Sequence, residues 1–151
     1  MDKVYVEATY KSLNKLNEEL CGDRVEIVKN DDSYFVVLSD GLGSGVKANI
    51  LSTLTSKIIS TMMFQGASIE DTVETIVHTL PVCSVRKVAY STFMILQIDY
   101  DGNAYLVEFD SPGCIFVRDG RLMNIEYNYR SIAGKEIKEA HFKVKPNDFK
   151  D

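Results

Sequence analysis

A glycine-rich segment between an apolar run and a helical pattern constrains this chain more than any other feature. Residues 34–38 read Tyr-Phe-Val-Val-Leu, which is typical of a strand covered on both faces. Ser39-Asp40-Gly41-Leu42-Gly43-Ser44-Gly45 follows, and after Gly45 apolar residues recur every four positions. Glycines permit a tight turn and let a ligand approach the backbone closely. The segment therefore predicts a strand, a sharp turn and a helix in direct succession.

Two familiar phosphate-binding loops do not match this segment. The Walker loop needs Gly-x-x-x-x-Gly-Lys followed by Ser or Thr, but here Lys47 stands two residues after Gly45 and Ala48 follows it. The dinucleotide loop needs Gly-x-Gly-x-x-Gly, whereas these glycines are spaced Gly-x-Gly-x-Gly. From the loop alone, a turn without a ligand stays an equal alternative to a binding loop.

Two amphipathic helices follow the glycine-rich segment. The first is predicted to end near Gly66 and to bury a stripe of residues spaced four apart, widened by three neighbours: Val46, Ile50, Leu54, Ile58 and Met62, with Leu51, Ile59 and Met63. Ser68 and Asp71 form the start signal of the second helix, which Pro81 ends. Its apolar face is predicted to contain Ile69, Val73, Ile76, Val77 and Leu80.

Runs of β-forming residues separated by turn residues fill the rest of the chain. Asp101-Gly102 and Asp119-Gly120 are two-residue hairpin signals, and Ser111-Pro112-Gly113 marks a further turn. We expect strands over residues 4–10, 23–28, 34–38, 90–100, 103–109, 114–118, 122–125 and 140–144, with a connection over 11–19. Antiparallel strands with two helices on one face form an α+β fold.

The composition predicts one globular domain in the cytoplasm. The 151 residues, 45% hydrophobic and 26% charged, suffice for a single packed core over residues 1–151. A net charge of −5 argues against a nucleic-acid partner, and no apolar run reaches the roughly 20 residues that cross a bilayer. We expect no secretory leader, because no apolar segment follows the first residues. Cys21, Cys83 and Cys114 are too scattered for a structural zinc site and indicate a reducing compartment.

Two aspartates are the candidate metal ligands. Asp40 ends an apolar strand, where a carboxylate needs hydrogen bonds, a cation or a metal ion. Asp23 begins the preceding strand, and hairpin pairing of the two strands would bring it to the same end of the sheet. The neighbouring carbonyl of Gly41 adds a third oxygen. Carboxylate, carbonyl and water oxygens are the ligands that Mg²⁺ and Mn²⁺ prefer.

These residues resemble the metal-dependent protein phosphatase superfamily (protein phosphatase 2C type). The resemblance is strongest to the bacterial branch with the stage II sporulation E phosphatase and the stressosome feedback phosphatases. It depends on Cys21-Gly22-Asp23, the apolar strand, and Ser39-Asp40-Gly41-Leu42-Gly43-Ser44-Gly45 with Ala48. Further segments agree in order and spacing, so that the resemblance spans residues 15–148: Ser91-Thr92-Phe93, Ser111-Pro112-Gly113, Arg118-Asp119-Gly120 and Val144-Lys145-Pro146-Asn147-Asp148.

The resemblance implies an αββα sandwich that holds two Mg²⁺ or Mn²⁺ ions. Asp40 would bridge the two ions, the Gly41 carbonyl would bind one, and Asp23 would bind one directly or through water. The implied reaction is hydrolysis of phosphoserine or phosphothreonine on a regulatory partner, such as a phosphorylated anti-sigma-factor antagonist. A metal-activated water would attack phosphorus, so no side chain is expected to act as the nucleophile and no organic cofactor is expected.

The family pattern contains further metal aspartates that this sequence lacks. Asp101, Asp119 and Asp148 stand at turn positions and are poor substitutes. We therefore expect residues 1–151 to be the N-terminal portion of the family domain, incomplete at the C-terminus, with a weakly bound second cation. Two alternatives remain: a catalytically silent phosphatase-like module that binds a protein, and a phosphate- or nucleotide-binding α/β protein that uses Lys47. The sequence leaves the oligomeric state and a redox role of Cys21 open.

Overall fold

The computed structural model describes residues 3–13, 22–41, 45–79, 91–146 and 148–150. These ranges contain two helices and nine strands, in the order β1 (Asp23–Lys29), β2 (Ser33–Asp40), α1 (Gly45–Phe64), α2 (Ile69–Thr79), β3 (Thr92–Asp99), β4 (Asn103–Phe109), β5 (Phe116–Arg118), β6 (Arg121–Met123), β7 (Asn128–Ile132), β8 (Lys135–Lys143) and β9 (Phe149–Lys150). Neither helix is long and apolar enough to span a membrane.

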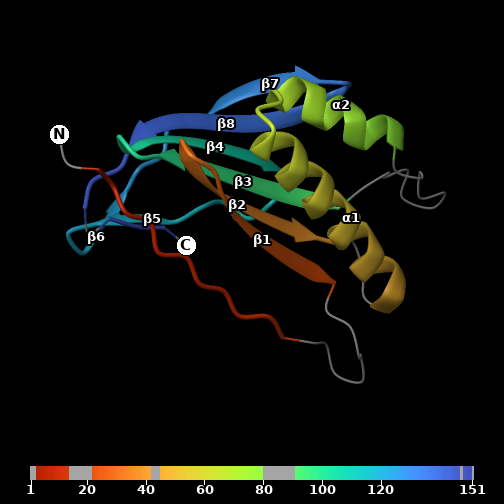
Figure 1. The fold of residues 1–151 in the computed structure, drawn as a ribbon, viewed down its shortest axis with the longest axis horizontal. Coiled ribbons are helices and arrows are strands. Elements are labelled where there is room, and N and C mark those ends of the chain that lie inside the picture. Colours follow the sequence, from red (N-terminus) through yellow and green to blue (C-terminus); the bar gives the residue numbers. More distant parts are fainter. Residues whose placement is uncertain (1–2, 14–21, 42–44, 80–90, 147, 151) are drawn as a thin grey trace.

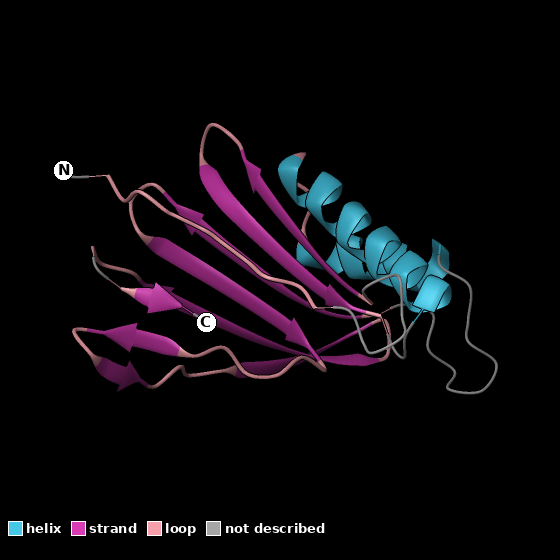
Figure 2. Ribbon diagram, turned by 90° about the horizontal axis from the view of Figure 1, so that it is seen from below, coloured by secondary structure: helices cyan, strands magenta, loops and turns pink. Residues whose placement is uncertain are grey.

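A six-stranded antiparallel sheet forms the centre of the molecule, with strand order β1-β2-β3-β4-β8-β7. Both helices lie on one face of this sheet (Figures 1 and 2). A small sheet, β6-β5-β9, lies on the other side. The α+β prediction is confirmed, because a helical layer and two antiparallel sheets are present.

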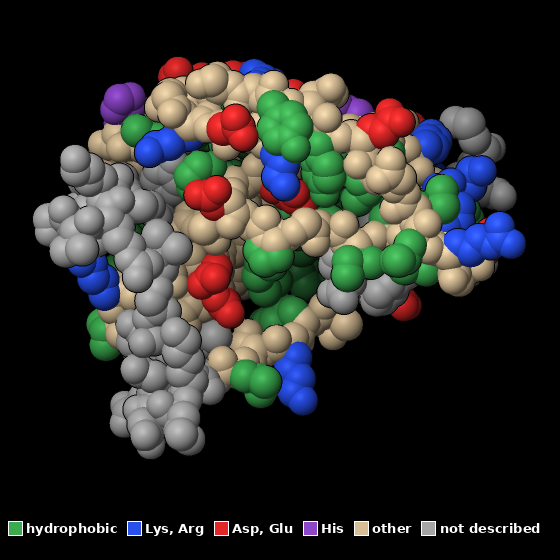
Figure 3. Space-filling view, turned by 180° about the vertical axis from the view of Figure 1, so that it is seen from behind, with side chains coloured by type: hydrophobic (Ala, Val, Ile, Leu, Met, Phe, Trp, Pro, Cys, Tyr) green, Lys and Arg blue, Asp and Glu red, His purple; other side chains and the backbone are tan. Residues whose placement is uncertain are grey.

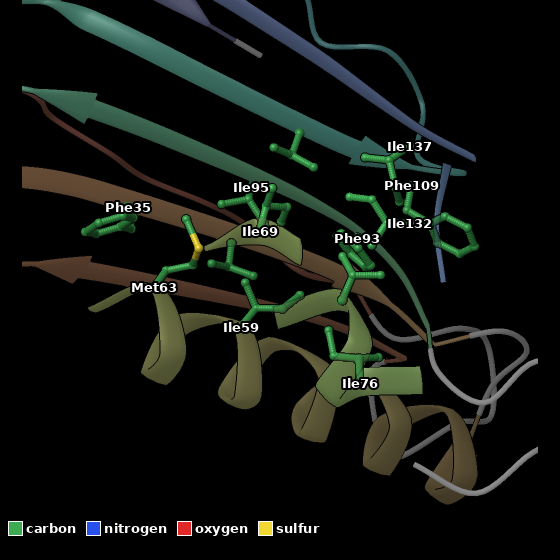
Figure 4. Close-up of a cluster of buried hydrophobic side chains, with 13 residues drawn as sticks. Phe35, Ile59, Met63, Ile69, Ile76, Phe93, Ile95, Phe109, Ile132 and Ile137 are labelled. Carbon is green, nitrogen blue, oxygen red and sulfur yellow. The ribbon is translucent and has the colours of Figure 1, made fainter. Parts of the chain in front are cut away.

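The main core lies between the helices and the large sheet (Figure 4). Alternate residues of β2 supply it, because side chains of a strand point to opposite faces in turn: Phe35 and Val37 are buried. The other buried members are Ile59, Met63, Ile69, Val73, Ile76, Phe93, Ile95, Val107, Phe109, Ile132 and Ile137. The opposite face of β2 is more open, since Leu38 is 37% exposed. The expectation that both faces of this strand are covered is therefore confirmed only in part, because Val36 on that face still packs on a second hydrophobic cluster.

Helix α1 has the predicted position, but only part of the predicted stripe is buried. Val46, Ile50 and Leu54 are exposed, and of the predicted set Leu51, Ile59 and Met63 are buried. The helix instead packs a hydroxyl-rich face on the sheet, with buried Ala48, Ser52, Thr55, Ser56 and Ser60.

Two physical reasons explain this orientation of α1. Residues four apart differ by about 40° around a helix, so a long i, i+4 series turns away from any one face. The buried serines also satisfy their own hydroxyls inside the helix. Ser52, Ser56 and Ser60 each donate a hydrogen bond to the carbonyl three residues earlier, at 3.1, 3.1 and 3.2 Å. Burial of this face therefore leaves none of these three hydroxyls without a partner.

Helix α2 begins as the sequence predicts. The backbone N–H of Asp71 donates to Ser68 Oγ at 3.1 Å, which is an N-cap bond. Ile69, Val73 and Ile76 are buried against the sheet, as expected. The predicted end at Leu80 and Pro81 lies outside the described residues.

The N-terminal segment crosses the second face of the large sheet without joining it as a strand. Residues 3–13 contain no strand, so the predicted strand over 4–10 is wrong. The Val4 N–H donates to the Tyr100 carbonyl at 2.8 Å, and Val4 and Val6 pack on a second hydrophobic cluster that includes Leu96 and Ile98. The segment is held mainly by side-chain contacts, with no β-ladder described for it. A cavity of about 860 Å³ remains between it and the sheet. Hydrophobic side chains are visible in this hollow on the face turned away from the helices (Figure 3).

The sequence analysis missed β7 and the first half of β8. A tight turn at Ala133 and Gly134, both with positive φ, connects the two strands. Strand β7 is polar, and its Arg130 forms ion pairs with Glu70 of α2 and with Glu139 of β8. Ion pairs and backbone pairing stabilise this edge strand, so it lacks the apolar alternation by which strands are predicted.

Candidate metal centre

Asp23 and Asp40 lie directly opposite each other at the ends of β1 and β2. The next pair outward, Gly22 and Gly41, is hydrogen-bonded, with the Gly41 N–H donating to the Gly22 carbonyl at 2.7 Å. Hydrogen-bonded and non-hydrogen-bonded pairs alternate along an antiparallel ladder, so Asp23 and Asp40 form a non-hydrogen-bonded pair. In such pairs the two side chains leave the same face and their Cβ atoms are only about 4.5–5.5 Å apart.

The two aspartates point away from the helices. Side chains along β2 point alternately to the two faces of the sheet, and buried Ser39 is on the same face as Phe35 and Val37, which pack against the helices. Asp40 therefore points to the opposite face. Both aspartates are exposed. On the neighbouring strand β3, Thr92 is the register partner of Asp40, and its Oγ1 donates to the Asp40 carbonyl at 3.4 Å. The structure thus aligns Asp23, Asp40 and Thr92 across three adjacent strands. The sequence analysis noted Thr92 within a motif and did not predict it as a site residue.

Gly41 is required here because the first turn of α1 approaches its backbone closely. A Cβ placed on Gly41 would lie 1.9 Å from the carbonyl oxygen of Ala48, far inside contact distance. Ala48 is itself buried, at 1% exposure. Because Gly41 has no side chain, the end of β2 can pack against the first turn of α1. This packing holds Asp40 close to the N-terminus of the helix. Leu42, Gly43 and Ser44 of the predicted loop lie outside the described residues, and so does Cys21.

The other aspartates that the sequence suggested as poor substitutes lie elsewhere. Asp148 accepts hydrogen bonds from Arg118 Nε and Nη2, both at 2.8 Å, and from the Lys145 N–H at 2.7 Å. Asp101 is in the β3–β4 turn, at the opposite end of the sheet from Asp40. Asp119 is in the β5–β6 turn. In the part of the chain that the structure describes, no three His, Cys, Asp or Glu residues come together as a metal site.

A buried carboxylate on β4 is a feature that the sequence analysis missed. Glu108 is fully buried, and its Oε1 accepts the Cys114 N–H at 3.0 Å and the Tyr127 hydroxyl at 3.4 Å. Lys138 Nζ lies 3.9 Å from Glu108 Oε2. Burial raises the pKa of Glu108, and the three neighbours offset this only in part. Burial and the charge of Glu108 in turn raise the pKa of Tyr127 to about 12.

The donor set at the end of β1 and β2 fits a hard divalent cation. Two carboxylates on one face repel each other, and a cation between them would remove this repulsion. All candidate ligands are oxygens, and none of them is a thiolate or an imidazole, which softer metals prefer. Two carboxylates cannot fill the six positions around Mg²⁺, so water or other oxygens must complete the set.

Comparison with known proteins identifies the family. The sequence model of stage II sporulation protein E (SpoIIE) matches residues 30–149. The chain belongs to the SpoIIE family. The matched part of this chain, residues 30–149, includes Asp40 and Gly41, whereas Asp23 lies N-terminal to it. No functionally curated protein matches the sequence significantly.

Solved structures similar to this SpoIIE-family chain share its fold at low sequence identity. The PP2C phosphatase domain with a fragment of the regulatory domain of SpoIIE from Bacillus subtilis has a TM-score of 0.76 at 20% identity, covering 91% of this chain and 41% of that one. A structure from a study of the bacterial stressosome has a TM-score of 0.73 at 13% identity and 93% and 71% coverage. RsbX in complex with magnesium has a TM-score of 0.69 at 19% identity and 93% and 69% coverage.

These likenesses confirm the predicted type of fold. The first of these structures is a PP2C phosphatase domain. The SpoIIE and RsbX structures match 91% and 93% of the length of this chain. The chain spans 41% of the SpoIIE structure with the fragment of the regulatory domain.

Proposed function

We propose that this chain carries part of the active site of a metal-dependent protein phosphatase acting in the cytoplasm. Asp40, Asp23 and the Gly41 carbonyl would hold Mg²⁺ or Mn²⁺. The substrate would be a phosphoserine or phosphothreonine on a regulatory partner protein. Residues 1–151 would form one structural unit with the first part of the metal site.

One observation carries the proposal: two carboxylates of adjacent strands occupy a narrow, non-hydrogen-bonded pair at an exposed sheet end. The pairing brings up to four carboxylate oxygens to one face of the sheet, and such oxygens are the ligands that Mg²⁺ and Mn²⁺ prefer. The magnesium in the similar RsbX structure supports the choice of a hard divalent ion.

The residues of this chain would each have a distinct task. Asp40 and Asp23 would place negative oxygens on one side of the cation, and Thr92 Oγ1 would stabilise the backbone carbonyl of Asp40, to which it donates at 3.4 Å. Gly41 would keep that strand end against α1. When bound, Mg²⁺ or Mn²⁺ lowers the pKa of a water ligand and neutralises phosphoryl oxygens.

A regulatory phosphoprotein is the proposed substrate because of the proteins that share the fold. One similar structure comes from work on the bacterial stressosome, described as a modular system adapted to control secondary messenger signalling. Another contains the RsbU and RsbW domains of a Mycobacterium tuberculosis protein. A silent phosphatase-like module is the second candidate, because the described part of the chain brings no third carboxylate to Asp23 and Asp40.

Calorimetric titration with Mn²⁺ tests the proposed site on the 151-residue chain. We expect Asp40→Asn to weaken Mn²⁺ binding at least tenfold, about 1.4 kcal/mol. Asp31→Asn is the matched control, because it removes the same charge from the turn at the other end of the β1–β2 hairpin. Equal binding by Asp40→Asn and the unmodified chain would refute the site.

Hydrolysis of phosphoserine peptides by the protein then separates the two candidates. Turnover that requires Mn²⁺ and is lost in Asp40→Asn supports the phosphatase. Metal binding without turnover supports the silent module instead.

A further inference from the structure

The N-terminal segment, residues 3–13, is a stretch of β-forming chain at the surface that joins no described sheet. It reads Lys-Val-Tyr-Val-Glu-Ala-Thr-Tyr-Lys-Ser-Leu, which is rich in residues that favour strands. It runs as an elongated trace outside the large sheet (Figure 1). All of its residues except Val4 and Val6 are exposed. An exposed strand without a neighbour offers its backbone groups to another strand.

The side chains of this segment alternate between the sheet and solvent. Val4 and Val6 pack on the second hydrophobic cluster, whereas Tyr5 between them is 76% exposed. A period of two is that of an extended strand. The Val4 N–H donates to the Tyr100 carbonyl at 2.8 Å, whereas the structure describes no backbone hydrogen bond for residues 5–12. The backbone groups of the odd-numbered residues point away from the Tyr100 side, so a second strand can pair with them.

Two opposite charges stand four positions apart on the solvent side of the segment. Glu7 and Lys11 are both exposed. Four residues of a strand span about 13 Å, which is too far for an ion pair within one segment. In an antiparallel pair, however, the strand of a second copy runs in the opposite direction and can place its Lys11 beside Glu7.

We propose that two copies of this chain associate through antiparallel pairing of residues 5–13, with the twofold axis at Thr9. Glu7 of each copy then lies opposite Lys11 of the other, Tyr5 lies opposite Leu13, and Thr9 lies opposite Thr9. Tyr5 and Leu13 are 76% and 78% exposed, and the pairing would cover both. Opposite charges, large apolar side chains and threonines stabilise antiparallel strands when they lie directly opposite each other. The five hydrogen-bonded pairs would form roughly ten backbone hydrogen bonds.

Other registers match these side chains less well. An axis at Glu7 would place Glu7 opposite Glu7 and Lys3 opposite Lys11, and like charges destabilise a strand pair. An axis at Tyr5 would pair Lys3 with Glu7 but would leave Lys11 and Leu13 outside the ladder. Charges on an edge strand also prevent pairing with unrelated strands. The alternation of Glu7 and Lys11 therefore favours a second copy over a strand of another protein.

The proposed interface is separate from the candidate metal centre. It contains neither Asp23 nor Asp40, so it depends on neither metal binding nor hydrolysis. A contact between two strands is small, and we expect a dissociation constant on the order of 10 μM.

Sedimentation velocity of the 151-residue chain in EDTA tests the proposal, since EDTA excludes a dimer linked by a cation. We expect a reversible monomer–dimer equilibrium between about 1 and about 200 μM. Glu7→Lys alone and Lys11→Glu alone should each weaken dimerisation at least about tenfold, because each places like charges opposite each other at two positions. An equimolar mixture of these two variants should associate again, because every lysine then meets a glutamate. Glu7→Lys combined with Lys11→Glu in one chain should also dimerise.

Glu74→Lys is the matched control, because it makes the same charge change at an exposed residue of α2, on the helical side of the large sheet. It should leave dimerisation unchanged. Amide hydrogen exchange should slow within residues 5–13 when the protein concentration exceeds the dissociation constant. Circular dichroism verifies that each variant folds, and the exposed positions of Glu7 and Lys11 make unfolding unexpected.

Three results would overturn the proposal. The first is a monomer at every concentration. The second is a mixture of Glu7→Lys and Lys11→Glu chains that does not associate. The third is unchanged or tighter association of Lys11→Glu alone, since this variant should weaken only the register with its axis at Thr9.

Discussion

Asp23 and Asp40 face each other across a narrow pair of the β1–β2 ladder. The two residues stand 17 positions apart in sequence (40 minus 23), and the hairpin brings them into register. Both carboxylates leave the same face of the sheet and are exposed. The pair therefore brings the oxygens of two carboxylates together at one end of the sheet.

Removing one charge of this pair should have opposite effects on stability and on binding. Asp23→Asn should raise the free energy of unfolding in EDTA by about 0.2–1 kcal/mol, because a like-charge cross-strand pair is removed. The same change should weaken Mn²⁺ binding. Urea unfolding with and without Mn²⁺ measures both effects. Destabilisation in EDTA would show that the aspartates do not repel each other.

Gly41 should tolerate no side chain. Gly41→Ala would place a Cβ against the Ala48 carbonyl oxygen, and the backbone of α1 or β2 must move. We expect a loss of about 1–3 kcal/mol in the free energy of unfolding. Gly113→Ala is the control, since a Cβ at that position would have no atom within 4 Å and the φ of Gly113 is not positive. Equal effects of the two substitutions in urea denaturation would contradict the close approach.

The orientation of α1 can be tested with one pair of substitutions. Ile59 is fully buried, so Ile59→Ala should cost about 2–5 kcal/mol of unfolding free energy. Leu54 is 42% exposed, and Leu54→Ala should cost less than about 1 kcal/mol. The predicted stripe of the sequence analysis demands similar costs at both positions, so chemical denaturation of the two variants decides between the orientations.

The buried carboxylate of Glu108 should make stability depend on pH. Because burial raises its pKa in the folded protein above the ordinary value of 4.5, the folded state holds this proton more tightly than the unfolded chain. This contribution is complete below about pH 4.5 and is lost as the pH rises through the raised pKa. Glu108→Gln removes it.

The unfolding free energy of Glu108→Gln, relative to the unmodified chain, should therefore increase from about pH 5 to about pH 8. Urea unfolding at several pH values in this range measures the difference. A difference that stays constant or decreases with pH would mean that Glu108 is not protonated more readily in the folded state.

Most of the local structure follows from the sequence. The apolar run before Asp40, the glycines after it and the capping residue Ser68 predicted β2, α1 and the start of α2. The Asp-Gly turns at residues 101–102 and 119–120 predicted two hairpins correctly. These signals are local: each depends on backbone conformations that neighbouring residues determine by themselves.

Elements stabilised by distant partners were predicted incorrectly. The segment over 4–10 has β-forming residues but no adjacent sheet edge, so it packs by Val4 and Val6 instead. Strand β7 has a polar sequence, and Arg130 connects it to β8 and α2. In both cases contacts with distant parts of the fold determine the structure of the segment. No sequence pattern within either segment indicates these contacts.

Local patterning alone was enough to predict the family motif, the strand–turn–helix around Asp40 and Gly41, and the proximity of Asp23. The buried face of α1, in contrast, depends on packing between distant segments. Large apolar side chains lie on both the exposed and the buried side of that helix, so periodicity alone cannot select the buried face. The close approach at Gly41 favours the small side of α1, which contains Ala48 and Ser52, because larger side chains would hold the helix away from the sheet. Val46, Ile50 and Leu54 remain at the surface as a consequence.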